Sequence, residues 1–154
     1  MRRLSGVLLA GAVLILPAFS QTAFAQAAPP QKTTYTGETV LAAYTVNPGK
    51  EADYEKVLAT LKDSLMKSPR PEAKQQLAGW KVIKNSANQP DGSPLYLHII
   101  TPVVKDADYS ILNNIYEVVK DPTEQRAVYD MYRAALKQPL FVIQGQLTSD
   151  LSKP

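Results

Sequence analysis

Hydrophobic and polar positions follow two periods along residues 38–148. Alternation with a period of two, rich in β-branched and aromatic side chains, predicts strands at residues 39–46, 80–84, 95–101 and 140–147. Apolar positions three and four residues apart predict helices at residues 50–67, 108–119 and 121–138, with a short helical turn at 72–77. The order is β-α-β-β-α-β with a divided second helical region. It predicts an α+β fold: a ferredoxin-like antiparallel sheet with its helices on one face.

Turn and capping residues support these boundaries. Asn47-Pro48-Gly49 ends the first strand, and Asp121-Pro122-Thr123-Glu124 supplies an N-cap followed by proline at the first helical position. Residues 88–94 are dense in turn formers and contain no helical period, so they connect the second and third strands as a hairpin. A parallel α/β sheet would need a helix at that connection.

The first 25 residues have the pattern of a secretory signal peptide. Arg2 and Arg3 precede an apolar stretch at residues 4–16 and the small-x-small triplet Ala23-Phe24-Ala25. Thirteen apolar residues are too few to span a bilayer. We therefore expect cleavage after Ala25 or Ala27 and a periplasmic or secreted protein with no membrane attachment after cleavage. The expected organisation is a signal peptide at 1–25, a flexible linker at 26–37, one domain at 38–148 and a tail at 149–154.

The amino-acid composition argues against several classes of function. Of the 17 basic residues, Arg2 and Arg3 would leave with the signal peptide, which gives 15 basic against 14 acidic side chains and a net charge of +1. This balance gives no reason to expect a nucleic-acid partner. The chain has no cysteine and one histidine, so we expect neither a disulfide nor a metal site. Signatures of serine hydrolases, phosphate-binding loops and zinc proteases are also missing from the sequence.

The segment from Val40 to Val46, followed by Asn47-Pro48-Gly49-Lys50-Glu51 and by Tyr54-Glu55, resembles the dimeric α/β-barrel superfamily, which includes antibiotic-biosynthesis-type monooxygenases. The segments at 74–82 and 106–109 are similar to exported bacterial members without an assigned activity. The resemblance in element order extends over about residues 39–148. It implies two protomers that appose their open sheet faces, with ligands between sheet and helices.

The pattern of the third strand favours a homodimer independently. Residues 95–100 are apolar on both faces, yet only one face can contact the protomer's own helices. A symmetric partner would cover the other face.

His98 is the single histidine, and any chemistry that needs imidazole must use it. If the side with Leu95, Leu97 and Ile99 faces the helices, Tyr96 and His98 face the open side or the dimer interface. There His98 is either a hydrogen-bonded interface residue or a weak candidate for a general base or a haem ligand. The predicted ligand-binding residues form a partly polar set: Thr45, Tyr96, His98, Gln144 and Gln146.

These observations favour a dimer that binds a small, partly apolar molecule. The alternative is a monooxygenase-like enzyme acting on an aromatic or quinone-type substrate. Haem is a further alternative, because the haem-degrading branch of the superfamily uses an asparagine, a tryptophan and a histidine. Asn47, Trp80 and His98 supply those residue types, although Asn47 ends a strand and His98 lies within one.

Overall fold

The computed structural model describes residues 31–149 and 151. The predicted signal peptide and both candidate cleavage sites lie outside the described residues, so export remains a prediction. The described elements are β1 Thr39–Val46, α1 Glu51–Lys67, α2 Ala73–Gly79, β2 Trp80–Lys84, β3 Leu95–Ile100, α3 Ile111–Val118, α4 Pro122–Ala135 and β4 Leu136–Gly145.

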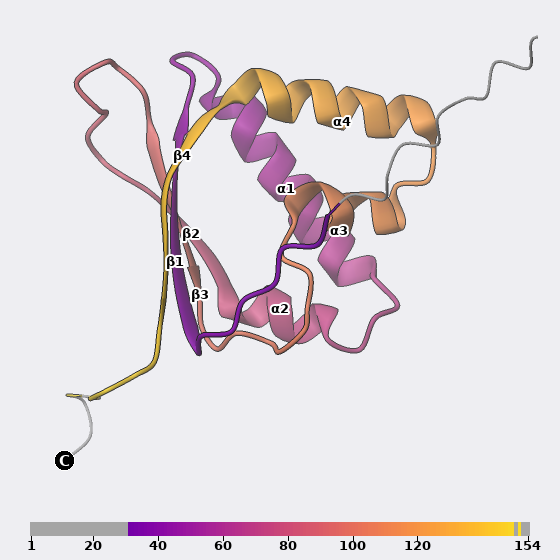
Figure 1. Cartoon of the computed structure of the whole chain (residues 1–154). Helices are drawn as coiled ribbons and strands as arrows, with labels where there is room; N and C mark the ends of the chain where they lie inside the picture. The colour runs from indigo at the N-terminus through magenta and orange to yellow at the C-terminus, as the bar shows by residue number, and fades with distance from the viewer. Residues whose placement is uncertain (1–30, 150, 152–154) are drawn as a thin grey trace, which may run out of the picture.

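The four strands form one antiparallel sheet in the order β2-β3-β1-β4. All four helices lie on the same side of this sheet (Figure 1). The predicted α+β class is therefore confirmed, and the arrangement is consistent with a ferredoxin-like fold. The apolar strands β1 and β3 occupy the centre, while β2 and β4 form the two edges.

Local sequence signals account for the starts of the later helices. Asp121 caps α4 as predicted: its carboxylate accepts hydrogen bonds from the backbone N–H groups of Thr123 and Glu124, both at 2.9 Å. The helix expected from Asp108 begins only at Ile111, where Ser110 is the N-cap. The Asp108 carboxylate instead accepts from the backbone N–H groups of Ser110 and Thr33, which holds the chain outside helical geometry.

A glycine allows α2 to run directly into β2. The backbone N–H of Thr101 donates to the carbonyl of Gly79 at 2.9 Å, which brings the two chain segments together. A Cβ atom at position 79 would lie 2.8 Å from the carbonyl oxygen of Pro102, closer than side chains normally approach. The close approach of the two backbones therefore requires glycine here.

The last strand differs from the prediction. Strand β4 follows α4 without a loop and starts at Leu136 rather than Leu140, and it ends at Gly145 rather than Leu147. Pro139 lies opposite Tyr44, where the register between β1 and β4 shifts. A proline lacks an N–H donor, but an irregular edge strand tolerates it. The predicted end of the last helix at residue 138 and start of the last strand at residue 140 were therefore wrong, since α4 ends at Ala135 and β4 begins at Leu136.

The faces of β3 are also reversed from the expectation. Tyr96 and His98 are each 2 % exposed and lie on the helix side, as Ile100 does. Leu95, Leu97 and Ile99 face the open side and are half-buried. The helix side accepts a histidine and a tyrosine because α1 and β2 supply polar partners for them.

The main apolar core lies between the helices and the sheet. Val57, Leu61 and Leu65 of α1 pack against Ile111 and Ile115 of α3. None of the helices within residues 31–149 combines the length and the apolar character that a membrane span requires.

Candidate functional site

An aromatic layer occupies the helix side of the sheet and surrounds His98. The ring of Tyr44 lies edge-on to the His98 ring at a centroid distance of 5.0 Å, and Trp80 lies 5.9 Å from it. The layer comprises Tyr35, Tyr44, Tyr54, Trp80, Tyr96, Tyr109 and Tyr132, and neighbouring rings contact each other. Such rings combine a large apolar surface with polar groups at their edges, so the layer suits contact with a partly apolar molecule.

Both ring nitrogens of His98 are engaged. The indole N–H of Trp80 donates to Nδ1 at 3.0 Å, and the hydroxyl oxygen of Tyr54 lies 2.9 Å from Nε2. An indole N–H is a donor only, so Nδ1 must be the acceptor and the proton of the neutral ring lies on Nε2. His98 therefore donates to the Tyr54 oxygen, and its tautomer is fixed by Trp80.

Burial keeps this group of side chains neutral. Desolvation lowers the pKa of His98 to about 4 and raises the pKa of Tyr132 to about 12. Desolvation likewise raises the pKa of the Tyr54 hydroxyl. Because the acceptor nitrogen of His98 is already bonded to Trp80, the imidazole is not free to take a proton from a substrate. Its geometry is that of a hydrogen-bonded core residue.

The five predicted ligand-binding residues do not converge on one pocket. Tyr96 and His98 lie together beneath the helices, where the Tyr96 hydroxyl donates to Glu55 Oε1 at 2.7 Å. Thr45 pairs with Leu95 across the strands and thus lies on the opposite face, where its hydroxyl donates to the Gln138 carbonyl.

The two glutamines lie elsewhere. The Gln144 side-chain oxygen accepts hydrogen bonds from the backbone N–H groups of Thr36 and Gly37, so it holds the N-terminal segment. Gln146 follows the end of β4 and lines a shallow depression on the open face with Leu41 and Ile143. The structure therefore does not bring these five side chains together.

The three residues considered for haem binding, Asn47, Trp80 and His98, do not lie together. Trp80 and His98 meet, but the Asn47 side chain donates to the Ala134 carbonyl at 2.8 Å. Ala42 pairs with His98 across the strands, and Asn47 lies five residues further along the chain. At the usual strand rise, this separates Asn47 from His98 by roughly 16 Å. An iron ligand at His98 would have to break one of the two bonds that the ring makes. Among the described residues, no group of three His, Asp or Glu side chains is placed to hold a metal ion.

The segment expected as a flexible linker is bound to the domain over its described part, residues 31–37. The backbone N–H of Thr33 donates to the Asp108 carboxylate, and its carbonyl accepts from the backbone N–H of Tyr109. The ring of Tyr35 contacts that of Tyr109 in a tilted arrangement, with the centroids 5.3 Å apart. Figure 1 shows this indigo segment running across the helix side of the sheet toward α3. It therefore covers one end of the aromatic layer.

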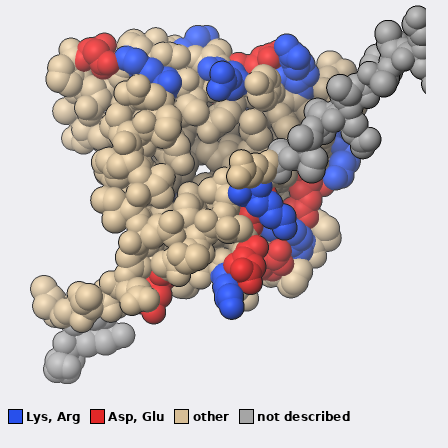
Figure 2. Space-filling view, viewed as in Figure 1, with Lys and Arg blue, Asp and Glu red and all other residues tan. Residues whose placement is uncertain are grey.

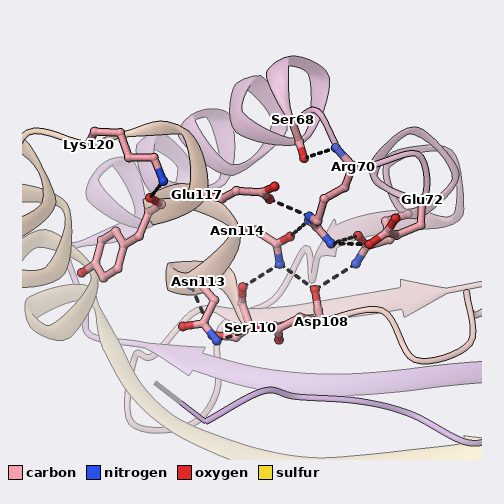
Figure 3. A network of polar contacts seen from close by, with 11 residues as sticks. Ser68, Arg70, Glu72, Asp108, Ser110, Asn113, Asn114, Glu117 and Lys120 are labelled. Atoms are coloured by element: carbon pink, nitrogen blue, oxygen red, sulfur yellow. Dashed lines mark hydrogen bonds and ion pairs between the residues drawn. The ribbon is translucent and has the colours of Figure 1, made fainter. Parts of the chain in front are cut away.

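Arg70 connects the loop after α1 to α2 and α3. Its guanidinium donates to Glu117 at 2.6 Å, to Asn114 at 2.5 Å and to the side chains of Glu72 and Gln76. Figure 3 shows the guanidinium between these side chains, with Asn114 also donating to the Asp108 carbonyl. These bonds tie the loop after α1 to α2 and α3, so the network acts as a structural junction, and it borders a cavity of about 220 Å³.

A cleft of about 190 Å³ lies where the helices leave part of β2 uncovered. Trp80 and Val82 form its sheet side, and Val82 remains 37 % exposed although it lies on the helix side. The helices contribute the rest of the lining: Leu58, Leu61, Lys62, Leu65 and Leu77. The apolar spacing of the first helix predicts an inward face that includes Leu58, Leu61 and Leu65, but it does not predict the cleft. The signal available was Trp80, a large side chain at the first position of an edge strand.

The open face of the sheet is largely apolar, and Lys81 of β2, the partner of Ile99, is an exposed charged residue on it. Ile143 on β4 is 57 % exposed and Ile83 on β2 is 48 % exposed, and the central strands add Leu41, Leu95, Leu97 and Ile99 between them. Strand β4 exposes apolar side chains on both faces, since Phe141 and Val142 are each more than two-fifths exposed. In Figure 2, charged side chains gather along the upper border and at the lower right, whereas the left part carries few.

Comparison of the chain with models of known protein families, with characterised proteins and with solved structures finds no match.

Proposed function

We propose that this chain is a homodimer that binds a small, partly apolar molecule between its sheet and its helices, in the manner expected of a dimeric α/β-barrel protein. The observation that carries the proposal is the uncovered, largely apolar face of the sheet, to which all four strands contribute apolar side chains. Monomeric proteins seldom leave a continuous apolar patch of this kind in contact with water.

A second copy is the occupant that this face fits best. Two identical sheets that meet about a twofold axis bury the same residues on each side, so an apolar face is complementary to itself. Ile83, Leu97 and Ile143 stand on three different strands and would enter the same buried layer. Apolar area removed from water contributes roughly 25 cal/mol per Å², which makes such a face the main source of free energy for association.

The exposure of β4 supports the same assembly. Edge strands are usually protected by charged side chains, proline or bulges. Pro139 and the register shift protect the beginning of β4, but Phe141, Val142 and Ile143 follow without any charge. A partner that covers this edge strand would prevent it from pairing with strands of other molecules and aggregating.

Binding is favoured over catalysis because the polar groups at the centre of the aromatic layer already have hydrogen-bond partners. His98 bonds to Trp80 and Tyr54, and Tyr96 bonds to Glu55. A catalytic base would need a free acceptor atom facing the substrate. An apolar ligand needs only shape and apolar contact, which the cleft beside Trp80 supplies.

Native mass spectrometry of the protein purified from its own host tests both parts of the proposal. The expected species has twice the chain mass plus a small additional mass, and this extra mass is lost on denaturation. A species of one chain mass at micromolar concentration would contradict the dimer. A dimer that never carries an added mass, even under gentle ionisation, would contradict ligand binding.

A further inference from the structure

We infer that the cleft beside Trp80 binds a small monocarboxylate with an apolar body, whose carboxylate pairs with Lys62. The inference rests on the proposed function, since it names the place and the chemical class of the ligand. It follows from the lining of the cleft, from the fixed position of Trp80 and from the single charge at its mouth.

The walls of the cleft are hydrocarbon and indole. Leu61 and Leu65 come from the buried face of α1, and Leu77 comes from α2. Six of the seven lining residues are apolar, and none is acidic. A ligand must therefore present an apolar surface to nearly all of the cleft.

The indole ring of Trp80 is held in place before any ligand binds and forms one wall of the cleft. Its N–H is bonded to Nδ1 of His98, which fixes the ring in place before any ligand arrives. A wall that is already ordered loses little conformational entropy when a ligand binds. The indole presents only hydrocarbon to the cleft, because its single polar group is bonded away from it.

Lys62 supplies the charge. It is an exposed residue of α1, and no salt bridge joins its amine to a carboxylate in the described part of the chain. By contrast, Lys84 at the end of β2 already pairs with Glu55, with its Nζ 3.2 Å from the Glu55 Oε1. A lone cation beside an apolar cleft complements a ligand with an apolar body and one anionic end.

The size of the cleft limits the ligand. A cavity of about 150 Å³ holds benzene, so a cleft of about 190 Å³ suits an apolar body of roughly seven or eight non-hydrogen atoms. Octanoate has this size and charge, and octanol provides the same apolar chain without the charge. This pair of molecules separates the apolar contribution from that of the carboxylate.

The experiment is a titration of the purified protein with octanoate and with octanol, followed by the fluorescence of Trp80, the only tryptophan of the chain. We expect a saturable change with one octanoate per protomer and an affinity for octanol about threefold weaker, in keeping with an ion pair at an exposed lysine. Lys62→Ala should remove the preference for octanoate. Lys56→Ala, an exposed lysine on the same helix that does not line the cleft, should keep it.

A blocked cleft provides the decisive control. Val82→Phe places a ring in the cleft from an edge strand, and Leu58→Phe does so from α1. Each variant should abolish octanoate binding while its far-ultraviolet circular dichroism stays unchanged. Equal affinities for octanoate and octanol, no binding of octanoate, or undiminished binding by a folded blocked variant would each overturn the inference. If one of these results is obtained while native mass spectrometry still finds a dimer with a host-derived molecule, the proposed function stands and the assignment of the ligand to this cleft fails.

Discussion

The indole N–H of Trp80 donates a hydrogen bond to Nδ1 of His98, with the two nitrogens 3.0 Å apart. This bond joins the edge strand β2 to the central strand β3 through their side chains and fixes the tautomer of the only histidine. It also orients the aromatic wall of the proposed ligand cleft. The same contact therefore links the stability of the core to the shape of the site.

The stability of the protein should fall as the pH is lowered from 7 to 5. Burial lowers the pKa of His98 in the folded protein to about 4, whereas histidine in the unfolded chain keeps its ordinary pKa of about 6.5. The unfolded state binds more protons in this window, so protonation favours unfolding. We expect a free energy of unfolding about 2 kcal/mol lower at pH 5 than at pH 7, measured by denaturation with urea.

The matched variant for this measurement is His98→Gln, which has no titrating group between pH 5 and 7. It should lose most of the pH dependence in that range. The single imidazole signal in a proton NMR spectrum should remain that of the neutral ring down to about pH 5, because the pKa of His98 is about 4. A signal that titrates near pH 6.5 in the folded protein would contradict the buried assignment.

Tyr54→Phe should destabilise the domain by about 1–2 kcal/mol, because it leaves the Nε2–H of His98 buried without an acceptor. Tyr129→Phe is the control, since Tyr129 is 40 % exposed and its loss of a hydroxyl leaves no buried group unpaired. Thermal unfolding of the two variants provides the comparison. Equal melting temperatures would show that the bond between Tyr54 and His98 contributes nothing.

Arg70→Ala should cost about 2–4 kcal/mol of stability, because it removes the shared partner of the buried side chains Asn114 and Gln76 and of Glu117. Arg126→Ala removes an exposed arginine that pairs with Asp130 one helical turn away, and this change should stay within about 0.5 kcal/mol. Urea unfolding measures both differences. A loss in the Arg70 variant as small as that in the Arg126 variant would refute the role of the network as a junction.

Part of this structure could be predicted from local sequence signals. The cap at Asp121 and the limits of α1 depend on residues within one helical turn, and both were predicted closely. The faces of β3 could not be read in this way. Leu95, Leu97 and Ile99 have the more apolar side chains, yet the other face is buried.

The reason lies in contacts that are distant in sequence. His98 becomes a favourable core residue only because Trp80 and Tyr54, 18 and 44 positions away, satisfy its two nitrogens. The cleft was missed for a related reason. The spacing of the leucines predicts which side of α1 faces the sheet. It does not predict that the helices leave part of the edge strand β2 uncovered.

The central claim is that the apolar open face of the sheet is buried against a second copy, and Ile143→Lys tests it most directly. Ile143 is 57 % exposed in one chain, so a lysine there should hardly affect the protomer itself, whereas in the dimer it would place a charge in an apolar interface. Met66→Lys on α1, at a residue that is 56 % exposed, is the matched control. Light scattering coupled to size exclusion should give twice the chain mass for the original protein and for the Met66 variant, and a single chain mass for the Ile143 variant. A single chain mass for the original protein, or an unchanged dimer with lysine at position 143, would contradict the account.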